Sequence, residues 1–170
     1  MPAQRRAWDA CSDFAASVQK DSGSGLLLLG RPGTGKTMLS VAIARRVIVN
    51  RGVSARIIGA RDLVRELRAT WRRDAQRSED DVIEDLAQVH LLVIDDIGLG
   101  FGTEKEQTQL LDVIDRRYQR RRPTVCSSNL NMPGLRDAIG ERALDRLRED
   151  ARIVLFEWPS HRRPAGAALA

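Results

Sequence analysis

Short apolar runs alternate with longer amphipathic stretches along this chain. Five such runs are predicted strands: LLLL at 26–29, ARIIGA at 55–60, VHLLVID at 89–95, TVCSS at 124–128 and ARIVLFEW at 151–158. A continuous apolar run of this length is typical of a parallel strand that is buried on both faces. Apolar positions at helical spacing predict helices over 3–20, 35–50, 61–88 (interrupted near RRDAQRSED), 104–121 and 140–150. The alternation predicts an α/β three-layer αβα sandwich with a five-stranded parallel sheet.

Length and composition fit one soluble globular domain. The chain has 170 residues, of which 42% are hydrophobic and 30% charged, and it contains no internal repeat. We expect a domain over 1–160 and a flexible tail over 161–170. The apolar runs are too short to span a bilayer, and the N-terminus lacks the apolar core of a signal peptide. These features predict a cytoplasmic protein without a membrane partner.

Cysteine usage and charge narrow the chemistry further. Cys11 and Cys126 are far apart and lack metal-ligand spacing, so neither a disulfide framework nor a zinc site is expected. The net charge is +5 and the pI about 10.0, which permits binding to nucleic acid. Nearly all of the positive charge is arginine, which a GC-rich genome would also produce. Charge alone therefore leaves nucleic-acid binding open.

The strongest chemical signal is the stretch GRPGTGKT, which fits the pattern GxxxxGK[ST] between the first strand and the next helix. Its glycines let successive backbone N–H groups face phosphates, and the helix N-terminus adds partial positive charge. The Lys36 ammonium can reach the β- and γ-phosphates of ATP, and the Thr37 hydroxyl can ligate Mg²⁺. A mere glycine-rich turn is the weaker interpretation. The predicted phosphate loop consists of Gly30, Arg31, Pro32, Gly33, Thr34, Gly35, Lys36 and Thr37.

Carboxylates follow the third predicted strand. LLVIDD ends in Asp95 and Asp96. Beside a phosphate loop, Asp95 is predicted to hold Mg²⁺, usually through water, and Asp96 to orient and activate the attacking water. Many related enzymes carry glutamate at the second position. The shorter aspartate implies either a different reach to the water or slow hydrolysis.

A polar residue is also expected at the end of the fourth strand, between the water and the γ-phosphate. TVCSSN offers Asn129, with Ser128 as the weaker candidate. An asparagine before a turn is often only a turn residue. The prediction is that Asn129 senses the γ-phosphate.

The stretch GERALDRLRED at 140–150 has two interpretations. Arg142 and Arg146 lie one turn apart on a short helix rich in acidic neighbours, which fits a surface helix with salt bridges. The alternative is an arginine that completes the active site of a neighbouring subunit. The residues around the helix do not decide between them.

Four stretches together resemble a known family. GRPGTGKT, LLVIDDIG, SSN and GERALDRLRED occur in the order and at the spacing of AAA+ ATPases. GERALDRLREDARIVLFEWPSHR is similar to the C-terminal part of DnaC-type helicase loaders, as are NRGVSARIIGARDLVRELRATW and VIEDLAQVHLLVIDDIG. The similarity covers residues 5–163, and the final block is its most specific part. IstB-type transposition helper ATPases share the core motifs.

The resemblance implies an ATPase that uses ATP and Mg²⁺, assembles on single-stranded DNA as a ring or filament, and helps to place the replicative helicase. In that family an arginine of the late block acts on the γ-phosphate of the adjacent subunit. The matching position is Arg146, with Arg142 as its companion. The family also carries a DNA-contacting helical insertion after the second strand. The matching basic face consists of Arg61, Arg65, Arg68 and Arg72, although an ordinary solvated face would look the same.

Two departures from the family bear on function. Only some twenty residues precede the first strand, so the segment that grips the helicase is expected to be absent or shortened. No room follows the fifth strand for the helical lid of many AAA+ proteins, which predicts an AAA+ core without a C-terminal lid. The alternatives to a loader are an IstB-type transposition helper and an ATP-gated DNA-binding module with negligible turnover. A metabolite kinase would need an acceptor pocket and a lid, and is disfavoured.

Overall fold

A five-stranded, fully parallel sheet forms the centre of the molecule. The computed structural model describes residues 2–18 and 23–162. The strand order is β2-β3-β4-β1-β5, and every neighbouring pair is parallel. The strands are β1 (Gly25–Gly30), β2 (Ala55–Gly59), β3 (Leu91–Asp95), β4 (Thr124–Ser128) and β5 (Ala151–Phe156). The predicted α/β sandwich with five parallel strands is confirmed.

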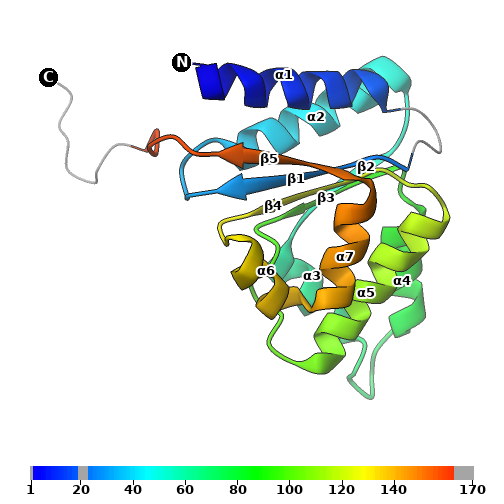
Figure 1. The fold of residues 1–170 in the computed structure, drawn as a ribbon. Helices are drawn as coiled ribbons and strands as arrows, with labels where there is room; N and C mark the ends of the chain where they lie inside the picture. The colour runs from blue at the N-terminus through cyan, green and yellow to red at the C-terminus, as the bar shows by residue number, and fades with distance from the viewer. Residues whose placement is uncertain (1, 19–22, 163–170) are drawn as a thin grey trace, which may run out of the picture.

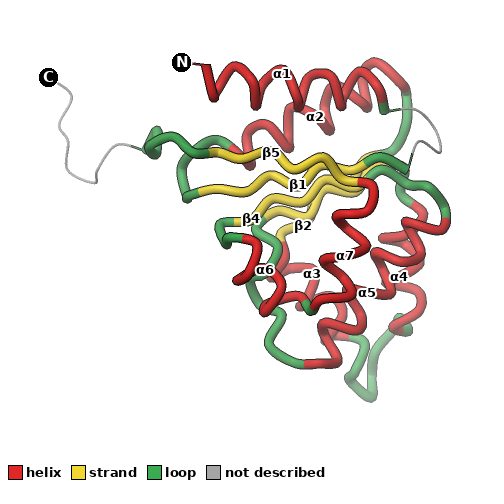
Figure 2. Tube along the Cα trace, in the orientation of Figure 1, coloured by secondary structure: helices red, strands yellow, loops and turns green. Residues whose placement is uncertain are grey.

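Helices cover both faces of this sheet. Figure 1 shows α1 and α2 on one face and α3 to α7 on the other, and Figure 2 shows the strands as a single layer between them. The helices are α1 (Pro2–Ser17), α2 (Lys36–Arg51), α3 (Ala60–Ala69), α4 (Glu79–Gln88), α5 (Glu104–Gln119), α6 (Met132–Ile139) and α7 (Glu141–Asp150).

The leucine run of β1 explains why the sheet has two cores. Leu26 and Leu28 pack with the α1 and α2 side chains, whereas Leu27 and Leu29 pack with the opposite helical layer. Each of these leucines is at most 4% exposed. Successive side chains of a strand point to opposite faces, so an uninterrupted apolar run is what a two-sided core requires. Burial of each leucine stabilises the fold by roughly 1.5–3 kcal/mol.

The helices differ from the sequence-based expectation in three places. The helical stretch expected over 61–88 is two helices, because α3 ends at Ala69 and α4 begins after Ser78, which forms a capping box with Asp81. Helix α6 was not predicted at all. Its signal is the N-cap Asn131, whose side chain accepts from Gly134 N at 2.9 Å, followed by proline in the first turn. The first helix, predicted over 3–20, ends earlier, because α1 stops at Ser17 and residue 18 is not helical; residues 19 and 20 lie outside the described residues.

A buried arginine ties the far end of the sheet together. Arg117 of α5 is 1% exposed and donates to the carbonyls of Leu86 and Val89, both at 2.8 Å, and of Pro123 at 2.6 Å. Burial lowers the pKa of its guanidinium to about 9. The contacts hold the start of β3 and β4 against α5. Among the described residues, no helix has the length and apolarity needed to cross a bilayer.

Candidate functional site at the carboxyl ends of the strands

The predicted phosphate loop joins β1 to α2 at the edge where all five strands end. Gly35 precedes the helix with φ 99°, a left-handed conformation that glycine adopts without strain, and Lys36 begins α2. The backbone N–H groups of the first turn of α2 have no partner within that helix. The loop therefore combines a helix N-terminus with a bend, which is the arrangement that binds phosphate.

Lys36 is a buried cation held by neutral acceptors. It is 5% exposed, and its Nζ donates to Gly30 O at 2.7 Å, Arg31 O at 3.0 Å and Asn129 Oδ1 at 2.7 Å. Burial lowers its pKa, and the nearby carboxylates of Asp96 and Asp95 partly oppose that shift. Because no carboxylate of the described residues bonds the ammonium directly, its charge remains available to an anion.

Thr37 and Asp95 form the predicted metal-binding pair. The Thr37 hydroxyl donates to Asp95 Oδ2 at 2.8 Å, and the Ser127 hydroxyl donates to the other carboxylate oxygen, Oδ1. A hydroxyl and a carboxylate are oxygen ligands, which Mg²⁺ prefers. The structure thus joins two residues that are 58 positions apart in the sequence.

Asp96 and Asn129 are also in contact. Asn129 Nδ2 donates to Asp96 Oδ1 at 2.7 Å, while its Oδ1 accepts from Lys36, so one amide links the loop to the second aspartate. Asp96 has φ 54°, a conformation uncommon for a residue with a Cβ. Its backbone N–H donates to Ser127 Oγ at 3.0 Å, which helps hold this conformation. Strained backbone of this kind is frequent at functional sites.

The two serines that precede Asn129 differ in role. Ser128, the weaker sequence candidate, is buried and donates to Ile97 O at 2.7 Å, away from the loop. Ser127 was not singled out by the sequence analysis, yet it contacts both aspartates. A polar residue near the end of β4, the strand next to β3, is too common a feature to single it out from sequence.

The segment after β5 returns over the phosphate loop. Trp158 Nε1 donates to Thr34 O at 3.0 Å, and His161 N donates to Gly33 O at 2.8 Å. Gly33 has φ +78°, and an added Cβ would lie 2.0 Å from Ser160 Oγ, so only glycine fits beneath this segment. Within the described part of the chain, residues 157–162 form no helix.

Arg162 is a cation near the site that the sequence analysis did not single out. Its charge contributes to the lowered pKa of Lys36. It falls within the flexible tail predicted over 161–170. Of that tail, residues 163–170 lie outside the described residues.

These side chains fit Mg²⁺ and ATP. Lys36 offers an uncompensated ammonium to phosphate, and the Thr37–Asp95 pair offers oxygen ligands to the metal. Thr37 and Asp95 would hold Mg²⁺, which would supply positive charge to offset the charge of the phosphates. One oxygen of Asp96, Oδ2, has no hydrogen-bond partner among the described residues, so it can accept a hydrogen bond from water.

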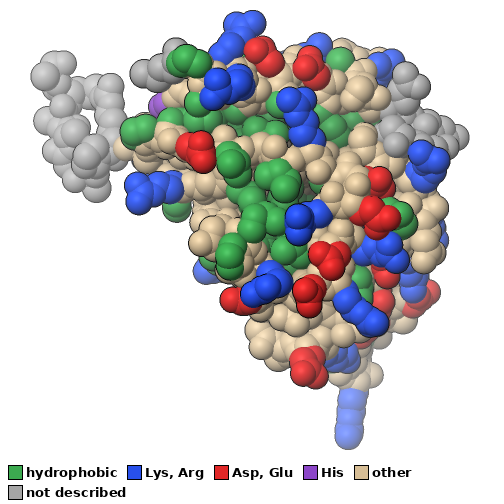
Figure 3. All heavy atoms as spheres, viewed as in Figure 1, with side chains coloured by type: hydrophobic (Ala, Val, Ile, Leu, Met, Phe, Trp, Pro, Cys, Tyr) green, Lys and Arg blue, Asp and Glu red, His purple; other side chains and the backbone are tan. Residues whose placement is uncertain are grey.

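The arginines of α7 lie elsewhere. Arg146 bonds with Asp115 of α5 and Glu149 of α7, each at 2.9 Å, and Arg142 lines the same surface hollow. Among the described residues, no hydrogen bond or ion pair links either arginine to the phosphate loop or its partners. Figure 3 shows basic and acidic side chains interspersed over the helices on this side of the sheet.

The predicted basic face on α3 is only partly continuous. Arg61, Arg65 and Arg68 lie on α3, but Arg72 follows the end of that helix. Arg65 pairs with Asp62 at 2.7 Å and Arg72 with Asp74 at 3.1 Å. Arg68 donates to the buried carboxylate of Glu106 at 2.5 Å. Among the described residues, Arg61 has no ion-pair partner.

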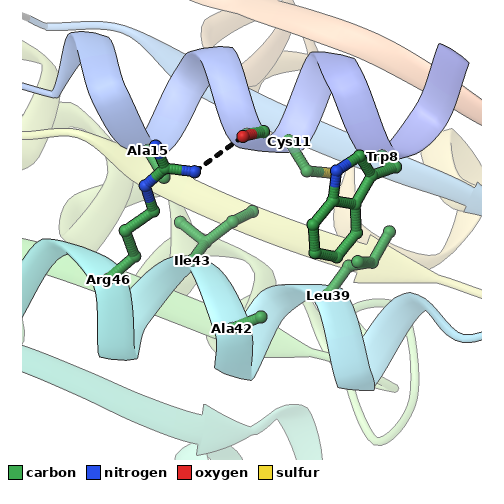
Figure 4. Close-up of a pocket in the computed structure, with 8 residues that line it drawn as sticks. Trp8, Cys11, Ala15, Leu39, Ala42, Ile43 and Arg46 are labelled. Atoms are coloured by element: carbon green, nitrogen blue, oxygen red, sulfur yellow. Dashed lines mark hydrogen bonds between the residues drawn. The ribbon is translucent and has the colours of Figure 1, made fainter. Parts of the chain in front are cut away.

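A separate small pocket lies between α1 and α2. It has a volume of about 90 Å³, and Figure 4 shows Trp8, Cys11 and Leu39 around it, with Arg46 donating to Ser12 at 2.6 Å. None of the predicted site residues line it. Burial raises the pKa of the Cys11 thiol to about 11, so this cysteine is protonated at neutral pH. The pocket is apolar and unsuited to phosphate.

Fold and site together define a P-loop NTPase with the architecture of AAA+ domains. The sheet order, the phosphate loop after β1, the aspartates at the end of β3 and the asparagine after β4 all belong to this class. The particular family follows from the sequence. Residues 10–165 match the family described as IstB-like ATP binding protein, and the chain belongs to it.

Curated relatives come from bacteria. The chain is 37% identical over 134 residues to the replicative helicase loader DnaC of Escherichia coli strain K12, covering 78% of this chain and 54% of the relative. It is 33% identical over 161 residues to the protein of that name from Buchnera aphidicola subsp. Schizaphis graminum, covering 94% and 65%. The chain thus spans less than two thirds of the length of these relatives.

Solved structures share the fold. A crystal structure of the DnaC helicase loader superposes with a TM-score of 0.80 at 21% identity, over 90% of this chain and 89% of that one. A crystal structure of DnaI gives 0.78 at 25% identity, over 94% and 85%. The replication initiator DnaA bound to AMPPCP and single-stranded DNA gives 0.78 at 19% identity, over 92% and 47%. The first and third of these likenesses concern the fold alone.

Proposed function

We propose that this chain hydrolyses ATP between subunits that assemble on single-stranded DNA and place the replicative helicase. The observation that carries the proposal is that Arg146 lies apart from the residues around the phosphate loop of the same chain. Lys36, Asp96 and Asn129 are linked at the carboxyl ends of the strands. Arg146 lies on α7 and bonds α5 instead. Arg146 of a neighbouring subunit would therefore complete this site, which the chain's own Arg146 does not contact.

The chemistry follows from the linked residues. Asp96 Oδ2 accepts a hydrogen bond from water, whose oxygen bonds to the γ-phosphorus as the bond to the β–γ bridging oxygen breaks. Asn129 fixes Asp96 and Lys36 relative to each other, and Lys36 stabilises charge on the phosphate oxygens. The water proton passes to Asp96 or to phosphate. Arg146 of a neighbouring subunit would stabilise the charge on the transferring phosphoryl group.

Exposed apolar side chains support self-assembly. Ile153 and Leu155 of the edge strand β5 are 40% and 51% exposed, and β5 follows α7 directly in the chain. A neighbouring copy that covered them would bury apolar area next to the arginine helix. This arrangement would bring α7 toward a second nucleotide site.

DNA binding by the basic face is part of the proposal. Arg61, Arg65 and Arg68 are exposed on α3, and Arg72 follows it. Three of the four arginines are paired with carboxylates, so binding to DNA would replace these carboxylates with phosphates. An Arg61→Ala, Arg65→Ala variant should flatten the plot of log affinity against log salt by about 0.7 per lost contact. An unchanged slope would remove these two residues from the interface.

The loader function rests on the named relatives, and a transposition helper is supported by the family description. Delivery of a ring-shaped replicative helicase to a single-stranded DNA circle is the direct test for the first. Preference for duplex over single-stranded DNA in the presence of ATP would favour the second. DNA binding that needs ATP without any phosphate release would favour an ATP-gated binding module.

The intersubunit site has a decisive experiment. Lys36→Ala removes the phosphate cation and Arg146→Ala the proposed arginine, so each protein alone should be inactive. In a mixture, some interfaces join an intact phosphate loop to an intact arginine, and part of the ATPase activity should return. Arg148→Ala, on the same helix and exposed, is the matched control and should retain activity. No recovery despite co-assembly would mean that Arg146 does not act across subunits.

A further inference from the structure

The guanidinium of Arg146 is held by three side chains from two helices. Its Nε donates to Asp115 Oδ1 of α5 and its Nη1 to Glu149 Oε2 of α7, each at 2.9 Å. Its central carbon lies 4.8 Å from the centre of the Tyr118 ring. The Tyr118 hydroxyl donates to Glu149 Oε1 at 2.8 Å, which fixes the second carboxylate in turn. We call Asp115, Tyr118 and Glu149 the arginine clamp.

The clamp distinguishes Arg146 from the other arginines of α7. Arg142 and Arg148 have no ion pair or ring contact among the described residues, although acidic residues surround them in the sequence. Ordinary surface attraction would not select one arginine of three for two carboxylates and an aromatic face. The partners of Arg146 also come from different helices, so helical spacing alone does not explain them.

Clamping leaves part of the guanidinium available. An arginine carries five N–H donors, and Nη2 has no hydrogen-bond partner among the described residues. The side chain is 43% exposed and lines a surface hollow of about 410 Å³ between α5 and α7. Nη2 can therefore donate to an anion without any loss of the clamp contacts.

Fixing the guanidinium has a physical advantage. A free arginine side chain samples many rotamers and loses that freedom when it binds phosphate. A side chain already held in one orientation loses less, which is how supporting residues sharpen a functional group. Pairs this exposed are individually weak, so they orient Arg146 without outcompeting a phosphate.

We propose that Asp115, Tyr118 and Glu149 are positioning residues that orient Arg146 toward the nucleotide of a neighbouring subunit. The inference rests on the proposed function, because it assigns these residues to the intersubunit step. They act through Arg146 and do not contact the nucleotide themselves.

Single substitutions test the clamp. Asp115→Asn and Glu149→Gln keep the shape and remove a charge, and each should lower kcat of the assembled ATPase by about 3- to 30-fold while KM stays within about 2-fold. Tyr118→Phe keeps the ring and should lose less than Tyr118→Leu. Asp145→Asn is the matched control, since Asp145 lines the same hollow without bonding Arg146, and should retain kcat. Unchanged kcat in both carboxylate variants would overturn the proposal, and a rise would mean that the clamp restrains Arg146.

Coupling and mixing separate positioning from simple stability. Combined with Arg146→Ala, Asp115→Asn should cause no further loss of kcat, because both changes act through one side chain. Mixed with Lys36→Ala, which has an intact clamp but no phosphate cation, the Asp115→Asn protein should recover turnover. An additive loss, or no recovery in demonstrated co-assemblies, would contradict the proposal. If Asp115→Asn does not fold, exposed Glu149→Gln gives the same readings.

The outcome also distinguishes this inference from the proposed function. If Arg146→Ala itself leaves turnover unchanged, the assignment of Arg146 to the intersubunit step is wrong, and the clamp proposal is wrong as well. If Arg146→Ala abolishes turnover while the clamp variants remain fully active, only the clamp proposal is wrong.

Discussion

The molecule holds two of its cations in opposite ways. Lys36 is 5% exposed and bonds two backbone carbonyls and one amide, all neutral acceptors. The Arg146 side chain is 43% exposed and bonds two carboxylates. Buried neutral acceptors satisfy an ammonium without offsetting its charge, whereas exposed carboxylates orient a guanidinium and offset part of its charge. Lys36 is therefore suited to an anion bound at the phosphate loop of its own subunit. Arg146 is instead held in one orientation at the surface.

The difference shows what completes each site. The phosphate loop receives its partners from β3, β4 and the segment after β5, so one chain assembles it. Arg146 receives its partners from α5 and α7, at an exposed surface of the chain. Substitutions at the phosphate loop should therefore affect nucleotide binding by a single subunit, whereas substitutions around Arg146 should affect only the assembled protein.

Lys36→Ala should give the largest effect. It removes an ammonium able to make charge-assisted hydrogen bonds to phosphate, so ATP affinity should fall by about 100-fold or more. Isothermal titration calorimetry with Mg–ATP measures the loss. Lys105→Ala is the matched control, since Lys105 lies at the surface beside Glu79 and Trp71. Affinity that survives in the Lys36 variant would refute the assignment of the loop.

Asn129→Ala should have the next largest effect. The amide links Lys36 to Asp96, so its removal should lower kcat by about 100-fold while ATP binding changes only a few-fold. Asn131→Ala, two positions on, removes the N-cap of α6 instead. That control should cost about 1 kcal/mol of stability and leave kcat intact. Equal losses of kcat in both variants would mean that Asn129 acts only through folding.

Local patterns in the sequence predict much of the first site. The alternation of apolar runs and amphipathic stretches predicts all five strands, and the loop pattern predicts a phosphate site between β1 and α2. Asp95, Asp96 and Asn129 are predictable because parallel strands bring their carboxyl ends to one edge of the sheet. Ser127 was missed because a serine within a strand carries no specific signal.

Contacts between distant segments could not be predicted. Arg162 falls in a stretch assigned to the tail, and the contacts that bring residues 158–161 to the phosphate loop depend on how β5 ends. Arg117 occupies a helix that looks amphipathic and charged, yet it is buried among carbonyls. The clamp joins Asp115 and Tyr118 to a helix about thirty residues later. Helical spacing within α7 carries no information about these partners.

The smallest predicted effect concerns the pKa of Glu149, one of the two carboxylates of the clamp. The pKa of Glu149 lies below its ordinary value of 4.5. The hydrogen bond from the Tyr118 hydroxyl is the largest cause, and the hydrogen bond from Arg146 is the next. A carboxyl whose pKa is depressed in the folded state contributes stability above its unfolded pKa, and that contribution is lost as pH falls through the folded value.

Removing the arginine should therefore reverse part of this shift. In Arg146→Ala, the pKa of Glu149, followed by NMR of its side-chain carboxyl carbon, should rise toward 4.5 without reaching it, because the Tyr118 hydroxyl still donates. Arg142→Ala should leave the pKa of Glu149 where it was, since Arg142 makes no bond to that carboxylate among the described residues. If the two variants shift Glu149 equally, general surface charge controls its pKa. The guanidinium would then not be held by the clamp, and the contrast between the two cations would reduce to burial alone.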